Sequence, residues 1–265
     1  MSPVISHMIR VLCFANQKGG VGKTTTTLNM AYHLSSLGKK VLVVDMDPQG
    51  NTSSRLVMRQ DGSGPIEYEG TRVSELFAPM GMPPSPMHCP RGIDLIHTLN
   101  NDLELRDIEA AEMDTIFQPS RNLAKLFEQY DYVLIDCPPS LGRNLLAALI
   151  CGTHVVCPVQ LSGFAVDGVE GLMNTIIGVQ NDYNPDLELV GLFVNKMDRN
   201  SKSSVRALEA LREAVGELLL ENVIMHRSPI DTAIDEGMPL NQLGYAHVAA
   251  KEVQAVMNEI CERVR

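Results

Sequence analysis

Lys18-Gly-Gly-Val-Gly-Lys-Thr-Thr25 is the stretch of sequence that decides the fold. An apolar run at residues 10–15 precedes it and predicts a strand, and the pattern of residues 23–37 predicts a helix after it. Glycines in such a turn let backbone N–H groups point inward around phosphate oxygens, and the helix N-terminus adds a positive dipole end. The stretch therefore predicts a phosphate-binding loop, and a glycine-rich turn without a ligand is the less favoured alternative.

The rest of the chain repeats this alternation of strands and helices. Further strands, each a nearly continuous apolar run that suits a parallel sheet buried on both faces, are predicted at residues 40–45, 132–136, 154–158 and 187–194. Helices are predicted at residues 142–149, 167–181, 201–220 and 248–265. We expect an α/β fold, with a doubly wound, mostly parallel sheet flanked by helices.

The length and composition favour a single domain that spans residues 1–265. Residues 51–100 break the alternation and predict an irregular loop or insertion, densest in Gly, Pro and Met at 78–92. A surface excursion of the domain is the favoured interpretation of 78–92, and an adaptable Met-rich partner surface is the alternative. No signal peptide and no apolar run of roughly 20 residues is found, so we expect a soluble, cytoplasmic protein.

Charge and cysteine content exclude further classes. A net charge of −10 disfavours a globally basic nucleic-acid binder, so any DNA contact must come from a local patch. The six cysteines form no CxxC pair, which favours reduced, buried thiols over a disulfide or zinc site.

Within the loop, Lys23 is expected to reach the β- and γ-phosphates, and the Thr24 hydroxyl to ligate Mg²⁺. The residues of the loop expected to contact the nucleotide are Gly19, Gly20, Val21, Gly22, Lys23, Thr24 and Thr25.

The loop departs from the ordinary G-x-x-x-x-G-K-[ST] pattern, because Gln17 occupies the first Gly position and Lys18 follows it. In this it resembles the deviant Walker A motif of the ParA/MinD ATPases, and most closely the short, Soj-like partition ATPases. The resemblance implies that Lys18 reaches across a dimer to the partner's nucleotide, with a solvated loop lysine as the alternative. It covers residues 11–240, is weakest at 51–100, and implies ATP and Mg²⁺ as cofactors.

Two acidic motifs follow predicted strands, where an open α/β sheet places its ligands. Val43-Val-Asp-Met-Asp-Pro-Gln-Gly-Asn51 resembles the second motif of the family, which implies that Asp47 orients the attacking water and that Asp45 lies near Mg²⁺. Val133-Leu-Ile-Asp-Cys-Pro-Pro-Ser140 resembles its Walker B motif, which implies that Asp136 holds Mg²⁺. The implied catalytic residues are Lys18, Lys23 and Asp47, and the implied metal ligands are Thr24, Asp45 and Asp136.

Asn195-Lys-Met-Asp198 has the form of the NKxD motif by which GTPases read guanine. ParA-like proteins also carry an Asn at this strand end, so we assign Asn195 to the base and favour ATP, with GTP open. The start of a capped helix is the alternative for this stretch.

The resemblance implies a slow, Mg²⁺-dependent ATP hydrolase that forms a homodimer with ATP, is stimulated by a ParB-type adaptor, and partitions or positions DNA or another cargo. It would be the short form, without a helix-turn-helix domain in front. The mixed charge of the predicted helix at 248–265 disfavours the membrane anchor of MinD relatives. An ATP-dependent ligase or a nitrogenase reductase-like protein is the alternative, and the reductase would need cluster-binding cysteines, for which Cys137 alone is a candidate.

We also expect ATP-dependent, sequence-independent DNA binding and, with it, association with the nucleoid. In chromosomal relatives the segment matching residues 224–240 carries arginines, whereas here only Arg227 is basic apart from His226. Arg199, Lys202 and Arg206 recur at helical spacing and are the substitute patch, with a solvated helix face as the alternative.

Overall fold

The computed structural model describes residues 9–161 and 165–264. At its centre is a seven-stranded sheet with strand order β3-β4-β2-β5-β1-β6-β7, in which every neighbouring pair is parallel except β3 and β4. The strands are β1 (Arg10–Phe14), β2 (Val41–Asp45), β3 (Met87–His88), β4 (Asp94–Ile96), β5 (Tyr132–Asp136), β6 (His154–Val159) and β7 (Glu188–Val194). The expected α/β class is confirmed.

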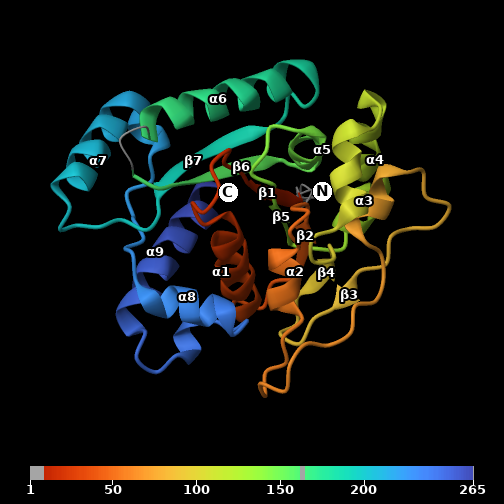
Figure 1. Ribbon diagram of the computed structural model, residues 1–265, viewed down its shortest axis with the longest axis horizontal. Helices are drawn as coiled ribbons and strands as arrows, with labels where there is room; N and C mark the ends of the chain where they lie inside the picture. The colour runs from red at the N-terminus through yellow and green to blue at the C-terminus, as the bar shows by residue number, and fades with distance from the viewer. Residues whose placement is uncertain (1–8, 162–164, 265) are drawn as a thin grey trace, which may run out of the picture.

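Helices cover both faces of the sheet (Figure 1). The α-helices are α1 (Lys23–Ser36), α2 (Asn51–Leu56), α3 (Leu103–Asp107), α4 (Gln118–Phe127), α5 (Arg143–Cys151), α6 (Ala165–Asp182), α7 (Lys202–Val215), α8 (Ser228–Asp235) and α9 (His247–Arg263). Short 3-10 helices lie at Val73–Phe77, Ile108–Ala110, Met113–Phe117, Gly216–Leu218 and Leu240–Gln242. Helices α4 to α7 share one buried apolar cluster with the sheet, and α1, α2, α8 and α9 share another on the opposite face. Both faces of the sheet are therefore buried, as its continuous apolar strands require.

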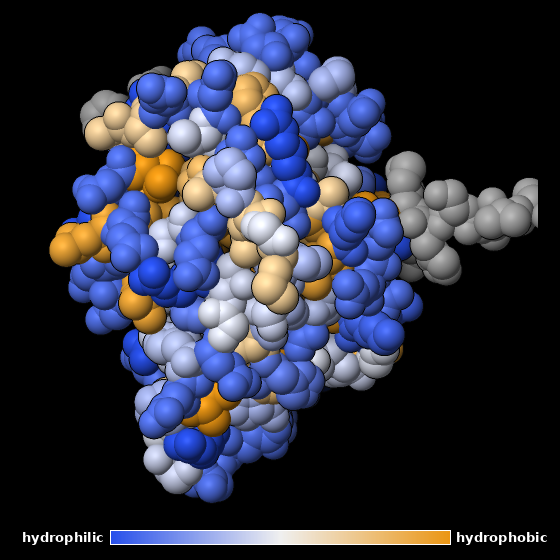
Figure 2. Space-filling view, turned by 90° about the vertical axis from the view of Figure 1, so that its right-hand side faces the viewer, coloured by the Kyte–Doolittle hydropathy of each residue, from blue (hydrophilic) through white to orange (hydrophobic). Residues whose placement is uncertain are grey.

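The segment 51–100 is more regular than the expected loop. It contributes α2 and two strands, and β4 pairs with β2 in the main sheet. The sequence did not predict β4 because a strand of three residues, Asp94–Ile96, is too short to show a period. The side of the molecule that carries α3 and α4 is mostly hydrophilic, with apolar side chains in small, separate patches (Figure 2).

The predicted helix at 201–220 ends early, at Val215. Gly216 takes a positive φ of 55°, and the chain then runs along the edge strand β7. There the backbone N–H groups of Leu220 and Ile224 donate to the carbonyls of Leu192 and Val194 at 2.7 and 2.9 Å. This segment therefore protects an otherwise unpaired sheet edge.

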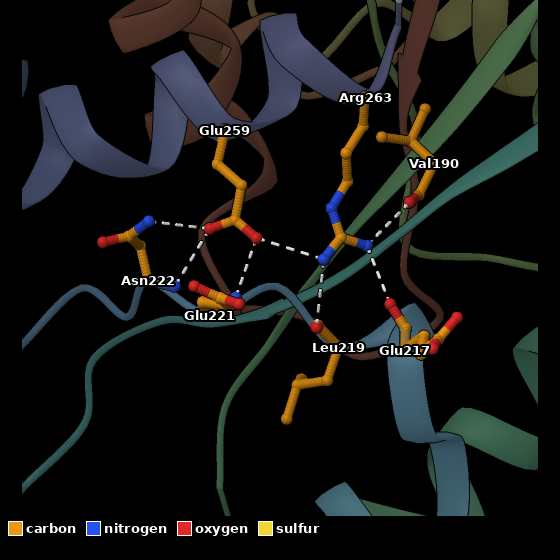
Figure 3. A network of polar contacts seen from close by, with 7 residues as sticks. All are labelled: Val190, Glu217, Leu219, Glu221, Asn222, Glu259 and Arg263. Atoms are coloured by element: carbon orange, nitrogen blue, oxygen red, sulfur yellow. Dashed lines mark hydrogen bonds and ion pairs between the residues drawn. The ribbon is translucent and has the colours of Figure 1, made fainter.

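Arg263 of α9 fixes the same edge (Figure 3). Its guanidinium donates to the carbonyls of Glu217 at 2.9 Å, Leu219 at 3.2 Å and Val190 at 3.4 Å, and pairs with Glu259 at 3.1 Å. The Glu259 carboxylate also accepts the backbone N–H of Glu221 at 2.8 Å. The C-terminal helix therefore serves as a clamp on β7. In the described part of the chain no helix is both long and apolar enough to cross a membrane.

Two glycines with positive φ test how close packing constrains this fold. Gly191 of β7 has φ 144°, and a Cβ there would overlap the carbonyl oxygen of Leu218. Gly38 has φ 72° after the end of α1, and a Cβ there would meet nothing within 4 Å. We expect Gly191→Ala to lower the free energy of unfolding by about 3 kcal/mol, from backbone strain and overpacking together. Gly38→Ala should lower it by about 1 kcal/mol, from strain alone. Urea denaturation measures both, and equal losses would contradict the assigned role of Leu218.

Candidate active site

The predicted motifs meet at the carboxyl edge of three adjacent strands. In the parallel register Asp45 of β2 and Phe14 of β1 both pair with Asp136 of β5. The glycine-rich loop leaves β1 at this edge, and α1 begins at Lys23 directly after it. The sheet therefore brings the glycine-rich loop and both acidic motifs together, although they are far apart in sequence.

The glycines of the loop have different reasons for being glycine. Gly20 and Gly22 take positive φ values of 76° and 101°, which side chains rarely adopt. A Cβ on Gly22 would overlap the Nδ2 atom of Asn195, so this glycine is required by close packing. A Cβ on Gly19 or Gly20 would meet nothing within 4 Å. The loop is therefore closely packed against Asn195 at Gly22 and has open space at Gly19 and Gly20, where a phosphate group fits.

Lys23 lies over this loop. Its side chain is buried, with 6% of the residue exposed, and its Nζ atom donates to the carbonyls of Asn16 at 3.1 Å and Lys18 at 3.4 Å. Burial lowers the pKa of Lys23, and the nearby Asp136 carboxylate opposes this effect. Lys18 itself is exposed, and its contact with a partner's nucleotide stays a prediction.

Asp136 and Thr24 form an arrangement that suits Mg²⁺. The Oδ2 atom of Asp136 accepts hydrogen bonds from the hydroxyls of Thr24 at 2.8 Å and Thr52 at 2.6 Å. Its Oδ1 atom is buried and has no partner among the described residues. Burial of the carboxyl raises the pKa of Asp136 to about 6, and the two hydroxyls oppose the rise.

A cation at this position would satisfy the unpartnered oxygen. No group of three His, Cys, Asp or Glu side chains suited to a metal occurs in the described ranges. Mg²⁺ needs no such group, because it binds through one or two carboxylates, phosphates and water. The residues present therefore fit Mg²⁺ bound together with a nucleotide.

Asp45 and Asp47 are both buried, but in different settings. The Oδ2 atom of Asp45 accepts the Ser53 backbone N–H at 2.8 Å and the Ser53 hydroxyl at 2.7 Å, which ties β2 to α2. Asp47 accepts the Gln49 N–H at 2.9 Å and leaves its other oxygen uncommitted in the described contacts. Burial raises the pKa of both carboxyls, and for Asp47 the bond from Gln49 and the charge of Lys23 oppose it. Asp47 therefore keeps one oxygen available, whereas Asp45 is hydrogen-bonded to Ser53 of α2, and the expected roles of Asp47 at the attacking water and of Asp45 near Mg²⁺ stay predictions.

Asn195 holds the loop from the end of β7. The residue is 2% exposed, its Nδ2 atom donates to the carbonyl of Val21 at 2.8 Å, and its Oδ1 atom accepts the Lys196 N–H at 3.0 Å. This support of the loop was not expected, and the contact of Asn195 with the base stays a prediction. The helix after it is capped by Ser201, whose hydroxyl accepts the Ser204 N–H at 3.2 Å.

Sequence reasoning missed two polar residues that shape the site. Thr52 donates to Asp136, and Asn16 bridges the loop by donating to the Pro158 carbonyl at 2.7 Å and accepting the Lys18 N–H at 2.9 Å. Only their positions next to the two motifs, one residue after Asn51 and two before Lys18, could have indicated them.

The residues proposed for DNA contact separate into two groups. Arg199, Lys202 and Arg206 are all exposed, and lie respectively before α7, at its first residue and in its second turn. Arg227 instead forms a bidentate pair with Glu252 of α9 at 2.8 and 2.7 Å. A phosphate would have to displace this carboxylate, so the α7 group is the better placed.

Comparisons with known proteins identify the family of this chain. Residues 9–189 match the AAA_31 family, described as an AAA domain. The chain is 34% identical over 259 residues to the chromosome-partitioning ATPase Soj of Thermus thermophilus, covering 97% of each protein. It is 32% identical over 265 residues to that of Treponema pallidum, covering 97% of this chain and 98% of that one. A solved cobyrinic acid a,c-diamide synthase of Mycobacterium smegmatis, with bound ADP and magnesium, is similar with a TM-score of 0.74 and 30% identity over 97% of each chain. The chain therefore belongs to the ParA/MinD-type P-loop ATPases.

Proposed function

We propose that this protein is a partition or positioning ATPase that binds and hydrolyses ATP with Mg²⁺ and dimerises in its ATP state. The observation that carries the proposal is the meeting of Lys23, Asp136 and Asp47 at one sheet edge, around a loop that is open in front. The Soj relatives, which share about a third of their residues with this chain, support the partition role.

Each group has a defined task in the proposed reaction. Backbone N–H groups of the loop and the Lys23 ammonium bind the phosphates and stabilise the charge of the transferring phosphoryl group. Thr24 and Asp136 would hold Mg²⁺, which would supply positive charge to offset that of the phosphates. Asp47 orients the attacking water. Because the hydroxyls of Thr24 and Thr52 already align the Asp136 carboxylate, little reorganisation is needed when the cation binds.

In the proposed dimer, the exposed Lys18 contacts the nucleotide of the partner subunit. Apolar side chains are also exposed near the site, since Leu103 follows the α3 N-cap and Leu141 follows the Walker B motif, with 69% and 57% exposure. The segment of Leu103 adjoins the site, because the backbone N–H of Asp102 donates to the carbonyl of Pro48, next to Asp47, at 2.9 Å. Leu141 lies five residues after Asp136 in the sequence. A second subunit would cover this apolar surface and bring Lys18 to the partner's nucleotide, and an adaptor of ParB type would then stimulate hydrolysis.

DNA binding in the ATP state, and with it nucleoid association, rests on the exposed group Arg199, Lys202 and Arg206. A dimer would present this group twice, which offsets part of the repulsion expected from a charge of −10 on each chain.

A second candidate is a biosynthetic enzyme, because one similar structure is named a diamide synthase. Such an enzyme couples ATP turnover to a second substrate. Hydrolysis in the absence of any metabolite separates the two functions.

We expect Mg²⁺-dependent ATP hydrolysis without any added metabolite, and a loss on the order of 10³-fold in Lys23→Ala, because the lysine stabilises transition-state charge. Phosphate release measures both. Lys39→Ala, an exposed lysine beyond the far end of α1, is the control and should keep parental turnover. Parental turnover in Lys23→Ala would refute the site, and turnover that requires a second substrate would favour the synthase.

Asp47→Ala should bind ATP but hydrolyse it poorly, since only the water-orienting carboxylate is lost, and dimers should therefore accumulate. Light scattering with ATP should give twice the monomer mass, and ADP should give the monomer. Lys18→Ala should bind ATP yet stay monomeric. One mass for all nucleotide states of the parent would argue against the dimer.

ATP-bound protein should shift random DNA duplexes in a gel, with affinity that falls steeply as salt rises, because phosphate contacts release counterions. Changing Arg199, Lys202 and Arg206 together to Glu should abolish the shift. The matched control changes Lys39, Lys125 and Lys251, exposed elsewhere, to Glu, so the net charge changes equally. Failure of the ATP-bound parent at low salt would indicate a cargo other than DNA, and equal loss in both variants would indicate a net-charge effect.

A further inference from the structure

Residues 101–110, which include α3 and form the bridge segment, connect the surroundings of the two acidic motifs. At the start of the bridge segment, the backbone N–H of Asp102 donates to the carbonyl of Pro48 at 2.9 Å, and Pro48 directly follows Asp47. Toward its end, the segment contacts the start of α5, which follows the Walker B motif. The bridge segment therefore meets both motifs, although it carries none of the residues assigned to the nucleotide or the metal.

Glu109 of the bridge segment holds the start of α5. Its Oε2 atom accepts the backbone N–H of Arg143 at 2.7 Å, and its Oε1 atom accepts that of Asn144 at 3.3 Å. The first N–H groups of a helix have no partner within the helix, and the N-cap residue Gly142 has no side chain to offer them. Glu109 therefore supplies the missing cap, and its negative charge also meets the positive end of the helix dipole.

Two further hydrogen bonds join the bridge segment to α5 without the Glu109 carboxylate. The guanidinium of Arg143 donates to the backbone carbonyl of Glu109, and the Nδ2 atom of the buried Asn144 donates to the carbonyl of Leu105 at 2.9 Å. Both acceptors are backbone atoms, so these bonds remain when the Glu109 side chain is shortened. A variant at Glu109 should therefore stay folded and lose only the cap.

Gly142 is a glycine because of this carboxylate. Its backbone is extended, with φ −120° and ψ −169°, a conformation that any residue adopts. A Cβ on Gly142 would overlap the carboxylate of Glu109, which is the end of a flexible side chain. A substitution at Gly142 would thus push the carboxylate away from the two N–H groups without straining the backbone.

The cap determines where an exposed apolar residue lies. Leu141 directly precedes Gly142, it is 57% exposed, and it belongs to the surface that a second subunit covers in the proposed dimer. We propose that Glu109 is a positioning residue for dimerisation, because it fixes the end of residues 137–142, and with it Leu141, relative to the bridge segment. The inference rests on the proposed function, since it concerns the ATP-bound dimer.

The loss of Glu109 should affect association and spare nucleotide binding. Asp136 is held by the hydroxyls of Thr24 and Thr52 and by its strand, and these contacts do not involve Glu109. A surface segment that is already held in place loses less entropy when a partner binds. Without the cap, that entropy is lost on dimerisation, and the dimer becomes weaker.

Light scattering over a dilution series with ATP measures the dimer dissociation constant, and titration of a fluorescent ATP analogue measures nucleotide affinity. Glu109→Ala should weaken the dimer about tenfold, on the scale of one hydrogen bond to a charged group, and bind nucleotide as the parent does. Its ATP turnover should fall at low protein concentration and recover as the concentration rises, which a general loss of stability would not produce. Glu112→Ala, at an exposed carboxylate three residues further on, is the matched control and should dimerise as the parent does.

Gly142→Ala tests the same contact from the other side. It should weaken the dimer in the parent, where it displaces the carboxylate, and have little further effect in Glu109→Ala, where the space is free. A parent that stays monomeric with ATP overturns the proposed function and this inference with it. If the parent dimerises, the inference alone is overturned when Glu109→Ala dimerises equally tightly, when Gly142→Ala acts equally in both backgrounds, or when high protein concentration fails to restore turnover.

Discussion

The site depends on how the protein stabilises two fully buried carboxylates, those of Asp45 and Asp136. They lie side by side at the ends of the neighbouring strands β2 and β5. Three hydroxyls surround them: Ser53 bonds Asp45, and Thr24 and Thr52 bond Asp136. Since the Asp136 pKa is still raised to about 6, this compensation is incomplete, and a cation at Asp136 completes it. The two carboxylates thus differ in their contacts: Asp45 is bonded to Ser53 of α2, and Asp136 keeps one oxygen without a hydrogen bond among the described residues.

Side-chain hydrogen bonds also hold the glycine-rich loop in place. Asn16 and Asn195 use their amides to hold it from two sides, through the Pro158 carbonyl of β6 and the Val21 carbonyl of the loop. A loop fixed by its neighbours keeps its N–H groups in place before the phosphate arrives, which reduces the entropy lost on binding. The same loop is therefore held by hydrogen bonds from Asn16 and Asn195 and still leaves room for a phosphate group.

Much of this could be predicted from the sequence because local signals were strong. The Gly-Lys-Thr turn between an apolar run and a helix determined the start of the sheet, and both acidic motifs lie where parallel strands end. The rest depends on long-range contacts that no short pattern encodes. The three-residue strand β4 has no period of its own, and Thr52 matters only through Asp136. The guanidinium of Arg227 is paired with the Glu252 carboxylate, 25 residues away, a contact that the local sequence does not indicate.

The hydrogen bonds from Arg263 to the edge of β7 have a consequence for the order in which contacts form during synthesis. Strand β1 is made first, yet its neighbour segments come much later, as Val11 bonds the Thr153 hydroxyl across 142 residues. The outer edge of strand β7 first pairs with the segment that holds Leu220 and Ile224, and the contact of Arg263 with the Val190 carbonyl forms only once α9 has been synthesised. During synthesis, β1 therefore stays without its strand neighbours until β5 has been made, which is a delay of more than a hundred residues between the first strand and its first partner.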